Sequence, residues 1–512
     1  MIPQATSRRV TVSQSRRFLT GVIAAAVVLP AIAAHAQCGP AWNIVGSPNV
    51  FRRDNTPSRL AVISPSDVWF AGSAARGTDN LQTLIQHWDG SSWKIVPSPN
   101  TTNAINLLIG LDAVDATNIW AVGFSTHDFG GSLETTLVEH WDGTAWSIIP
   151  SPNPQPHNPD LGPYEVSNEL FDLAVVNGHD IWAVGESVTF SNGQPLTMHW
   201  NGNKWTAIPS PVTGDYGFLR SVDAVSANDV WAIGTQYNQG FQEIIIRHWD
   251  GTQWNIVPAP PISGSVPVMT SIKHVAANDI WAVGYRLEVF DYRTTILHYD
   301  GTAWSVIDSP NVNERSNFLH DLTVVAKNDI YAVGAFETDF ATGESLVMHW
   351  DGNAWTIMPS PNRSDSLNEL FTVAAVGPND VWAAGDDFGA ANYETFVVHL
   401  TDPCATPTMH IANIAPSSQT LSNGQFRVRA AVTVKDAGNA AVADAVVTMQ
   451  FTRPDGQMIT RTANTNPAGV AASTITSSVT GTYTIAVTAV AKAGSTYDPG
   501  SNVETSDTVT IP

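Results

Sequence analysis

Acidic side chains recur at matching places in repeated segments of this 512-residue sequence. Asp172 and Asp321 stand at equivalent positions of two segments, and Glu169 and Glu369 each occur in an Asn-Glu-Leu phrase. A carboxylate pair, Asp172 with Asp321 or Glu169 with Glu369, has the chemistry to act as acid and base on a glycosidic bond. The alternative is a solvated, hydrogen-bonded network with a structural role, because such networks also collect carboxylates.

Aligning the repeats brings further polar side chains into two columns, two residues apart, that should face the same side of a strand. Arg220 and His320 lie just before the first column, at the level of the two glutamates. If these strands line a channel, the channel is polar and mainly acidic, with Arg59 and Lys273 as its cations. The candidate ligand-binding residues are Arg59, Asp112, Asp172, Arg220, Asp223, Lys273, His320 and Asp321.

The elements that must position these residues are copies of one unit of about fifty residues. The phrase HWDGSSWKIVPSPN at 87–100 recurs five more times with small changes, and SDVWFAG at 66–72 recurs six more times. Gly, Asn, Asp and Pro separate β-branched and aromatic runs, which in the fourth unit predict strands over 219–225, 230–235, 243–249 and 254–257. Four strands in each of seven units predict an all-β fold, a seven-bladed β-propeller over residues 37–404.

The seventh unit lacks its last strand, because nothing like the usual Gly-x-x-Trp segment follows the predicted strand over 396–400. The segment GPAWNIV at 39–45 matches the missing piece, so the N-terminal strand should close the last blade. The two cysteines of the chain, Cys38 and Cys404, flank this junction. In an exported protein a disulfide between them is expected, and the alternative is two unpaired buried thiols.

All 18 tryptophans fall at repeat positions. They are expected to form the core between neighbouring sheets, and the alternative is a sugar-stacking platform repeated in every blade. The repeat histidines should be structural as well. They are His87, His140, His199, His248, His298, His349 and His399.

Loop lengths indicate which face of the propeller carries function. The connections between strands two and three, and between strand four and the next unit, are long and varied, whereas the others are short and nearly identical. Both long classes emerge on one face, around the mouth of the central channel, so a ligand site is expected there. The longest connection covers 151–167.

The composition bounds the partners of the chain. Only 14% of the residues are charged, 43% are hydrophobic and the formal net charge is −22. A balance this acidic argues against nucleic acid or an anionic membrane surface as the main partner. An extracellular protein or a glycan is the expected partner, and the chain is expected to be a monomer.

The first 36 residues predict an export signal. Residues 1–20 carry positive charge without an acidic residue, 21–34 are apolar, and Ala34-His35-Ala36 is typical of a cleavage site. The segment at 15–19 resembles a twin-arginine motif, so both the general secretory and the twin-arginine routes stay open. No other segment is long and apolar enough to span a bilayer, and we expect a secreted, periplasmic or cell-surface protein.

Several chemistries lack their sequence signatures. There is no C-x-x-C or H-E-x-x-H zinc pattern, no phosphate-binding glycine loop and no G-x-S-x-G elbow. No cofactor and no catalytic metal are therefore expected. Structural calcium near acidic segments such as Asp386-Asp387, Glu337 and Asp339 stays open, without a ligand-spacing pattern.

The sequence changes character after Cys404, where Trp disappears and Ala, Thr and Val dominate. Alternating runs at 426–434, 446–451, 470–475, 483–490 and 508–511 predict a β-sandwich over residues 405–512. The phrases DAGNAAVADAVVTMQF, NPAGVAAS and GTYTIAV resemble bacterial Ig-like modules. That resemblance implies a spacer or adhesion domain, with Tyr483 as a tyrosine corner.

The repeat phrases resemble those of secreted bacterial propellers of the kelch-like type, similar to the central domain of galactose oxidase. The likeness implies architecture and leaves activity open, because such propellers serve many functions. A copper-radical oxidase would need a cysteine bonded to tyrosine, and both cysteines are assigned to the junction. The leading hypothesis is a non-catalytic binding or scaffold protein, and the alternative is a glycoside hydrolase or polysaccharide lyase.

Overall fold

The computed structural model describes residues 39–50, 54–75, 80–102, 105–126, 134–154, 166–189, 192–262, 265–339, 342–388, 392–402, 408–436 and 440–512. The export signal predicted over 1–36 lies outside these ranges, and so do Cys38, Cys404 and most of the connection at 151–167. Within these ranges no helix is long and apolar enough to cross a membrane.

The described residues of 41–401 form three four-stranded sheets and two eight-stranded sheets. Each eight-stranded sheet consists of two antiparallel four-stranded units joined by one parallel bridge. In each unit four strands pair side by side in order. In the fourth unit of the sequence these are β14 (Tyr216–Ser226), β15 (Asp229–Asn238), β16 (Phe241–Trp249) and β17 (Trp254–Val257). The four strands predicted for this unit are confirmed, and the first three are longer than predicted. This is the arrangement of a β-propeller.

The remaining propeller strands follow the same order. Those before β14 are β2 (Asn55–Ser64), β3 (Asp67–Ala75), β4 (Leu81–Trp88), β5 (Trp93–Val96), β6 (Ile105–Asp115), β7 (Asn118–Thr126), β8 (Thr135–Trp141), β9 (Trp146–Ile148), β10 (Val166–Asn177), β11 (Asp180–Thr189), β12 (Asn192–Trp200) and β13 (Trp205–Ala207). Those after β17 are β18 (Ser265–Ala276), β19 (Asp279–Glu288), β20 (Asp291–Tyr299), β21 (Trp304–Ile307), β22 (Asn317–Ala326), β23 (Asp329–Asp339), β24 (Thr342–Trp350), β25 (Trp355–Met358), β26 (Asn368–Gly377), β27 (Asp380–Phe388) and β28 (Tyr393–Thr401).

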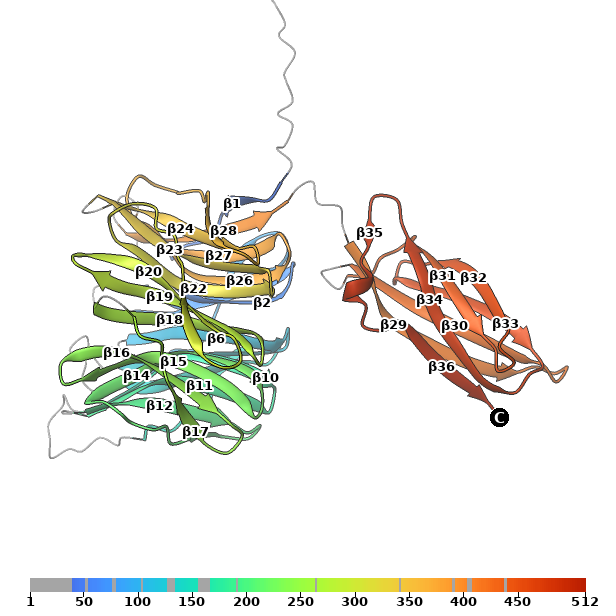
Figure 1. Ribbon diagram of the computed structural model, residues 1–512, viewed down its shortest axis with the longest axis horizontal. Helices are drawn as coiled ribbons and strands as arrows, with labels where there is room; N and C mark the ends of the chain where they lie inside the picture. Colours follow the sequence, from blue (N-terminus) through green and yellow to red (C-terminus); the bar gives the residue numbers. More distant parts are fainter. Residues whose placement is uncertain are drawn as a thin grey trace, which may run out of the picture. The chain divides into compact units, whose positions relative to one another are not determined.

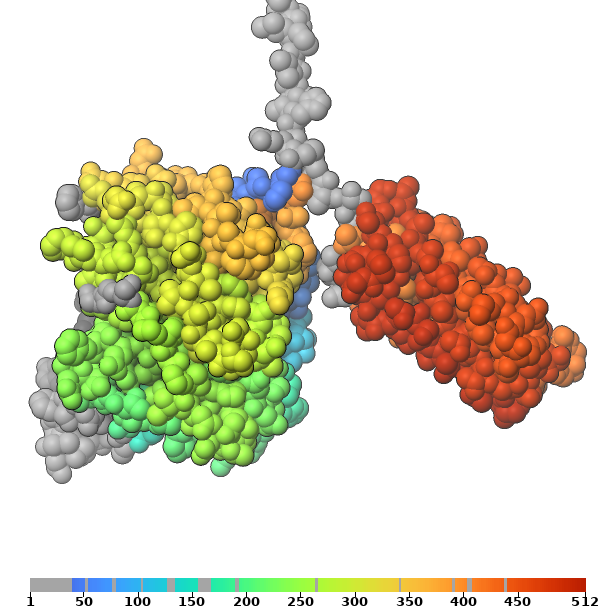
Figure 2. Space-filling view, viewed as in Figure 1, coloured from blue at the N-terminus to red at the C-terminus, as the bar shows by residue number. Residues whose placement is uncertain are grey.

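The sheets close into a ring. The innermost strands β2, β6, β10, β14, β18, β22 and β26 each contact the next, and β26 contacts β2. The N-terminal strand β1 (Ala41–Val45) pairs antiparallel with β28, with Ala41 opposite Thr401 and Val45 opposite Val397. Figure 1 shows blue β1 beside orange β28, and their atoms are in contact on the surface in Figure 2. The predicted pairing of these two segments is therefore present.

Tryptophans lock neighbouring sheets together. Trp182 of β11 packs in one cluster with Val222 of β14, Val230 of β15 and Trp254 of β17, so two sheets share that core. Trp182 and Trp254 are only 1% and 3% exposed. Such burial leaves these two rings no surface for a sugar, and 13 of the 18 tryptophans are buried in this way, so the core prediction is confirmed for them. The five tryptophans that follow a repeat histidine are only half-buried: Trp88, Trp141, Trp200, Trp249 and Trp350.

Each repeat histidine is held by a side chain at the start of the second strand. In the fourth unit Asp229 accepts hydrogen bonds from Trp231 Nε1 at 2.8 Å and binds His248 Nε2 at 2.8 Å. The His248 ring also stacks on Trp231, with centroids 4.3 Å apart. The histidine contact recurs in all seven units, as expected for structural histidines. The tryptophan hydrogen bond does not, because the Nε1 atoms of Trp182 and Trp382 have no partner and the sixth unit has Tyr331 in place of tryptophan.

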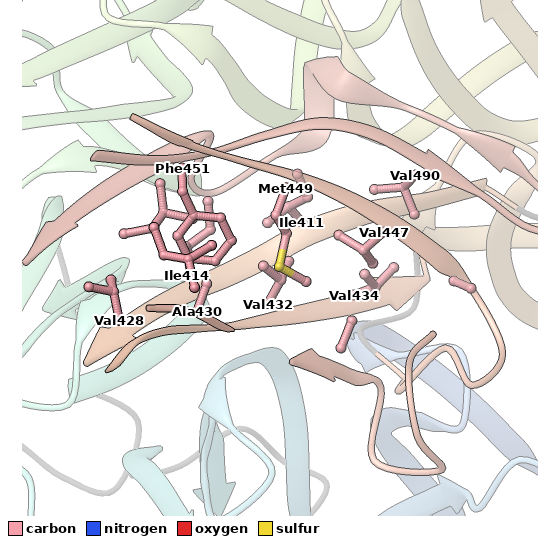
Figure 3. Close-up of a cluster of buried hydrophobic side chains, with 14 of the residues drawn as sticks. Ile411, Ile414, Val428, Ala430, Val432, Val434, Val447, Met449, Phe451 and Val490 are labelled. Atoms are coloured by element: carbon pink, nitrogen blue, oxygen red, sulfur yellow. The ribbon is translucent and has the colours of Figure 1, made fainter. Parts of the chain in front are cut away.

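Residues 408–511 form two four-stranded sheets around a separate core. Figure 3 shows Phe451 and Met449 of one sheet facing Ile411 and Ile414 of the other. The buried Tyr483 hydroxyl donates to the Val479 carbonyl at 2.7 Å, the contact expected of a tyrosine corner. One sheet contains β29 (Thr408–Thr420), β30 (Phe426–Asp436), β33 (Val470–Ser477) and β35 (Thr496–Tyr497), and the other β31 (Val446–Thr452), β32 (Met458–Asn464), β34 (Gly481–Ala491) and β36 (Ser506–Ile511).

Candidate functional site

Every innermost strand of the propeller carries a β-bulge at the same place. The pairing of β2 with β3 skips Ser58, and the pairing of β14 with β15 skips Arg220. A bulge interrupts the alternation of side chains and re-aims the skipped residue, here toward the channel. The skipped residues, called the bulge ring below, are Ser58, Ile109, Phe171, Arg220, Thr270, His320 and Phe371.

The bulge ring lines a cup of about 290 Å³ at the mouth of the channel. Arg59 forms part of its floor, and Thr56, Pro57 and Leu107 complete the wall. The bulges lie in the first half of each innermost strand, which the long connections enter, so the cup opens on the face expected to bind a ligand.

The floor of the cup is a buried ionic network. Arg59 reaches Asp172 at 3.0 Å and Asp321 at 2.8 Å, and both carboxylates are 2% exposed. Ser221 donates to Asp172 at 2.7 Å, and Ser271 donates to Asp321 at 2.6 Å. Each carboxylate is thus paired and hydrogen-bonded, as a buried charge must be.

This environment bears directly on the first candidate acid–base pair. A catalytic carboxylate must come within hydrogen-bonding reach of its substrate. The carboxylate oxygens of Asp172 and Asp321 instead bind Arg59 and accept hydrogen bonds from neighbouring strands, with Thr372 donating to Asp321 at 3.0 Å. The geometry favours a structural role for this pair, in a network that is buried and not solvated.

A second polar layer lies below the floor. Arg59 also borders a cavity of about 150 Å³ on that side, together with Asp112 and Lys273. Asp223 binds His274 and lies 3.7 Å from Lys273. Burial lowers the pKa of Lys273, but attraction to carboxylates, Asp223 first, outweighs it and the net shift is upward. Burial raises the pKa of Asp112 to about 6, against the opposing charge of Lys273.

Arg220 is the exposed member of the bulge ring. Its guanidinium carbon lies 5.2 Å from the centroid of the Phe171 ring, within cation–π range. Phe171 in turn packs edge-on against Phe218, 6.0 Å away. The aromatic pair therefore holds the guanidinium over the cup and leaves its N–H groups facing solvent.

His320 and Glu369 meet on another part of the wall, on β22 and β26, with β18 between them and the Arg220 strand β14. His320 Nε2 lies 2.6 Å from Glu369 Oε1, and both side chains are about one-fifth exposed. The imidazole also contacts the Phe371 ring, with centroids 5.7 Å apart. A carboxylate that orients an imidazole at the edge of a cavity is an arrangement suited to proton transfer or to ligand binding.

Glu169 belongs to a different cluster from Glu369. The single Ser167 hydroxyl lies within hydrogen-bonding distance of Glu169, at 2.9 Å, and of Glu134, and Tyr216 donates to Glu186. Burial, then the neighbouring Glu134, raises the pKa of Glu169. The structure does not join Glu169 to Glu369 as a pair.

The acidic segments considered for calcium have protein partners. Asp386 accepts from Thr56 at 3.0 Å, Arg363 lies 3.3 Å from Asp387, and Arg315 lies 3.4 Å from Asp339. In the described part of the chain no group of three or more His, Cys, Asp or Glu side chains could hold a metal ion.

The sequence placed eight ligand-binding candidates in the channel, and the structure divides them by depth. Arg220 and His320 face the cup, Arg59, Asp172 and Asp321 form its floor, and the others lie below. The apolar members of the bulge ring, Ile109, Phe171 and Phe371, were not predicted. Strict alternation along a strand would turn them into the core.

Comparisons with known proteins extend to fold alone. No protein-family model and no curated protein matches the sequence. Similar solved structures include YCF48 bound to D1 peptide, at 13% identity and TM-score 0.44, with 70% of this chain and 96% of that chain covered. The extracellular domain of the putative one component system BT4673 from B. thetaiotaomicron matches at 11% identity and TM-score 0.45, with 89% of this chain and 60% of that chain covered. The fucose-specific lectin from Aleuria aurantia matches at 14% identity and TM-score 0.37, with 60% of this chain and 98% of that chain covered. The chain is thus structurally similar to β-propeller proteins.

Proposed function

We propose that this chain is an exported binding or scaffold protein that takes a protein or glycan ligand at the long-loop face of a β-propeller. The propeller is seven-bladed and of the kelch-like type, and residues 405–512 are an Ig-like spacer or adhesion module. The closed order of innermost strands, with β26 against β2, supports the blade count. The two sheets around one core and the Tyr483 hydrogen bond support the Ig-like assignment.

The observation that carries the proposal is the bulge ring above a closed floor. In each of seven strands one residue is left out of the strand pairing, and the side chains of these seven residues line the same cup. An interrupted ladder weakens pairing locally, and bulges gather beside sites where they re-aim side chains. A concave, mostly apolar cavity with a few polar groups is the usual form of a binding site.

The test is a binding screen with the mature protein against a glycan array and an extracellular-protein array. We expect hits whose binding is lost in Arg220→Ala and Phe371→Ala. Asn255→Ala, a change on the exposed outer strand β17, should leave binding intact. If binding survives both cup substitutions, the ligand site is elsewhere and the proposal is wrong.

One observation supports the alternative, a polysaccharide lyase or glycoside hydrolase. Glu369 lies 2.6 Å from His320, which lines the same cup as Arg220. In a lyase, a cation neutralises the uronate carboxylate while a base removes the neighbouring proton, so Arg220 and His320 have suitable chemistry. Release of unsaturated uronate from a polysaccharide panel, abolished by His320→Ala, would establish this alternative.

A further inference from the structure

Arg220 makes no direct ion pair or hydrogen bond with the described residues, and its guanidinium lies over the ring of Phe171. The carboxylates of Asp172, Glu169 and Glu186 attract its charge only from beyond ion-pair distance. Other arginines of the propeller have direct partners: the two Nη atoms of Arg59 bind two carboxylates, and Arg293 donates to the carbonyl oxygens of Asn313 and Arg315 at 2.8 and 2.9 Å. The exposed fork of Arg220 therefore offers paired N–H donors to an incoming carboxylate.

The rest of the cup has few free polar groups. Thr270 Oγ1 already donates to the carbonyl oxygens of Val283 and Leu319, and Thr56 donates to Asp386. His320 is bound to Glu369 through Nε2. A sugar entering this cup would lose water from several hydroxyl groups and find few partners, which costs free energy for each unsatisfied group.

Carbon atoms make up much of the wall. Leu107, Ile109, Phe171 and Phe371 all line the cup. Binding an apolar group to such a surface is favourable because both apolar surfaces leave water, whereas a hydroxylated group gains less. The ligand that fits best has one anionic end and an apolar group beside it.

The closed floor limits the ligand to a chain end. Arg59 borders both the cup and the cavity below it, and its two ion pairs seal the level between them. The cup volume lies near the lower end of ligand pockets, which are roughly 300–1,000 Å³. A continuous strand cannot pass through, and a folded surface cannot enter.

We propose that the cup binds the C-terminal end of a peptide whose last residue is apolar, with the terminal carboxylate on the Arg220 guanidinium. The inference rests on the proposed binding function and narrows its ligand to a peptide. The net charge of −22 also favours a single terminal carboxylate over a polyanionic glycan, which the chain would repel at long range.

A matched pair of peptide pools tests the inference. Hexapeptides of mixed sequence, one pool with free C-terminal carboxylates and one with C-terminal amides, are passed over the immobilised mature protein and bound species are identified by mass spectrometry. Free acids ending in Leu, Ile or Phe should be enriched at least about tenfold over their amides, since a charged hydrogen bond gives that much discrimination.

Substitutions assign the enrichment to the cup. Arg220→Ala should abolish the preference for the acid, and Arg220→Lys should retain only part of it because a lysine cannot bind bidentately. Phe171→Ala should weaken binding of the acids, with tryptophan fluorescence confirming the fold. Arg461→Ala, an exposed arginine of β32, is the control and should change nothing.

Three results would overturn the inference. They are equal capture of acids and amides, acid capture that survives Arg220→Ala, and no capture of any free-acid peptide. Arg220-dependent binding of galacturonate or glucuronate oligosaccharides without peptide binding would replace the peptide by an acidic glycan and leave the proposed function standing. If neither pool nor any array ligand depends on the cup, the proposed function fails too.

Discussion

Arg59 Nη1 lies 2.8 Å from Asp321 Oδ1, although the two residues come from strands β2 and β22, which are not neighbours in the ring. The same guanidinium also reaches Asp172 on β10. Side chains from three separate sheets therefore meet across the channel. Their charges are buried, so each depends on the others to offset the loss of water.

The first prediction concerns this contact. Arg59→Met should destabilise the propeller by about 3–5 kcal/mol, because it leaves two buried carboxylates without their cation. Urea unfolding followed by tryptophan fluorescence measures the effect on the propeller alone, since all 18 tryptophans lie between residues 42 and 382.

A triple variant is the control for that prediction. Arg59→Met with Asp172→Asn and Asp321→Asn removes all three charges and should recover most of the lost stability. If Arg59→Met costs less than about 1 kcal/mol, the network is not the buried ion cluster described here.

The second prediction concerns pH. Glu139 of β8 is fully buried, and no well-formed hydrogen bond reaches its carboxylate oxygens, although the nearby Ser98 hydroxyl lowers its pKa in part. Burial raises the pKa of Glu139 to about 8, above that of an unfolded chain. The protonated form stabilises the fold fully below about pH 4.5, and this contribution is lost as the pH rises through 8. Glu139→Gln should therefore stabilise the propeller by about 2–4 kcal/mol at pH 9 and change little at pH 4.

The equivalent residue of the preceding repeat unit supplies a reciprocal control. Gln86 is also buried immediately before its repeat histidine, and its Nε2 donates to the Pro48 carbonyl at 2.6 Å. Gln86→Glu places a buried carboxyl group on β4, so this variant should lose stability as the pH rises. Glu139→Gln removes the same kind of group from β8 and should abolish the corresponding loss of stability there. Stability curves of both variants that run parallel to the parent from pH 4 to 9 would contradict the assignment.

The third prediction concerns the contacts behind the repeat histidines. Asp229→Ala should lower the free energy of unfolding by about 1–3 kcal/mol, because Trp231 and His248 both lose a hydrogen-bond partner. Asp229→Asn should cost much less, since Asn118 already accepts from Trp120 and binds His140 at 2.8 Å in the second unit. The same fluorescence measurement compares the two, and equal losses would show that the negative charge itself is required.

Much of the propeller could be predicted because each copy of the repeat restates the same turns and apolar runs. The strand predicted over 254–257 coincides with β17, and β1 pairs with β28 as expected. The columns also brought Arg59, Asp172 and Asp321 into one layer. Their pairing could not be predicted, since it depends on how far each side chain reaches across the channel.

The bulge ring escaped prediction for a physical reason. Strict alternation makes the residue between two channel-facing positions a core residue, and a bulge breaks that rule by one position. Ile109, Phe171 and Phe371 are compatible with a core, so nothing in their types revealed the bulge. Arg220 and His320 were the one visible signal, because a charged group between core positions conflicts with burial.

The last prediction concerns Cys38 and Cys404. The described register between β1 and β28 has Ala41 opposite Thr401, and Gly39 N donates to Asp402 Oδ1 at 3.3 Å beyond that pair. If this register continued outward by three residues, beyond the described residues, position 38 would stand opposite position 404. Directly opposed residues of antiparallel strands have Cα atoms about 4.5–5.5 Å apart, a separation that a disulfide spans.

We therefore expect the protein exported to an oxidising compartment to contain no free thiol and to yield a Cys38–Cys404 peptide on non-reducing digestion. Changing either cysteine to Ser should lower the unfolding temperature and leave the ring folded, because the strand pairing and Trp42 packing remain. Two free thiols in that protein would refute the bond.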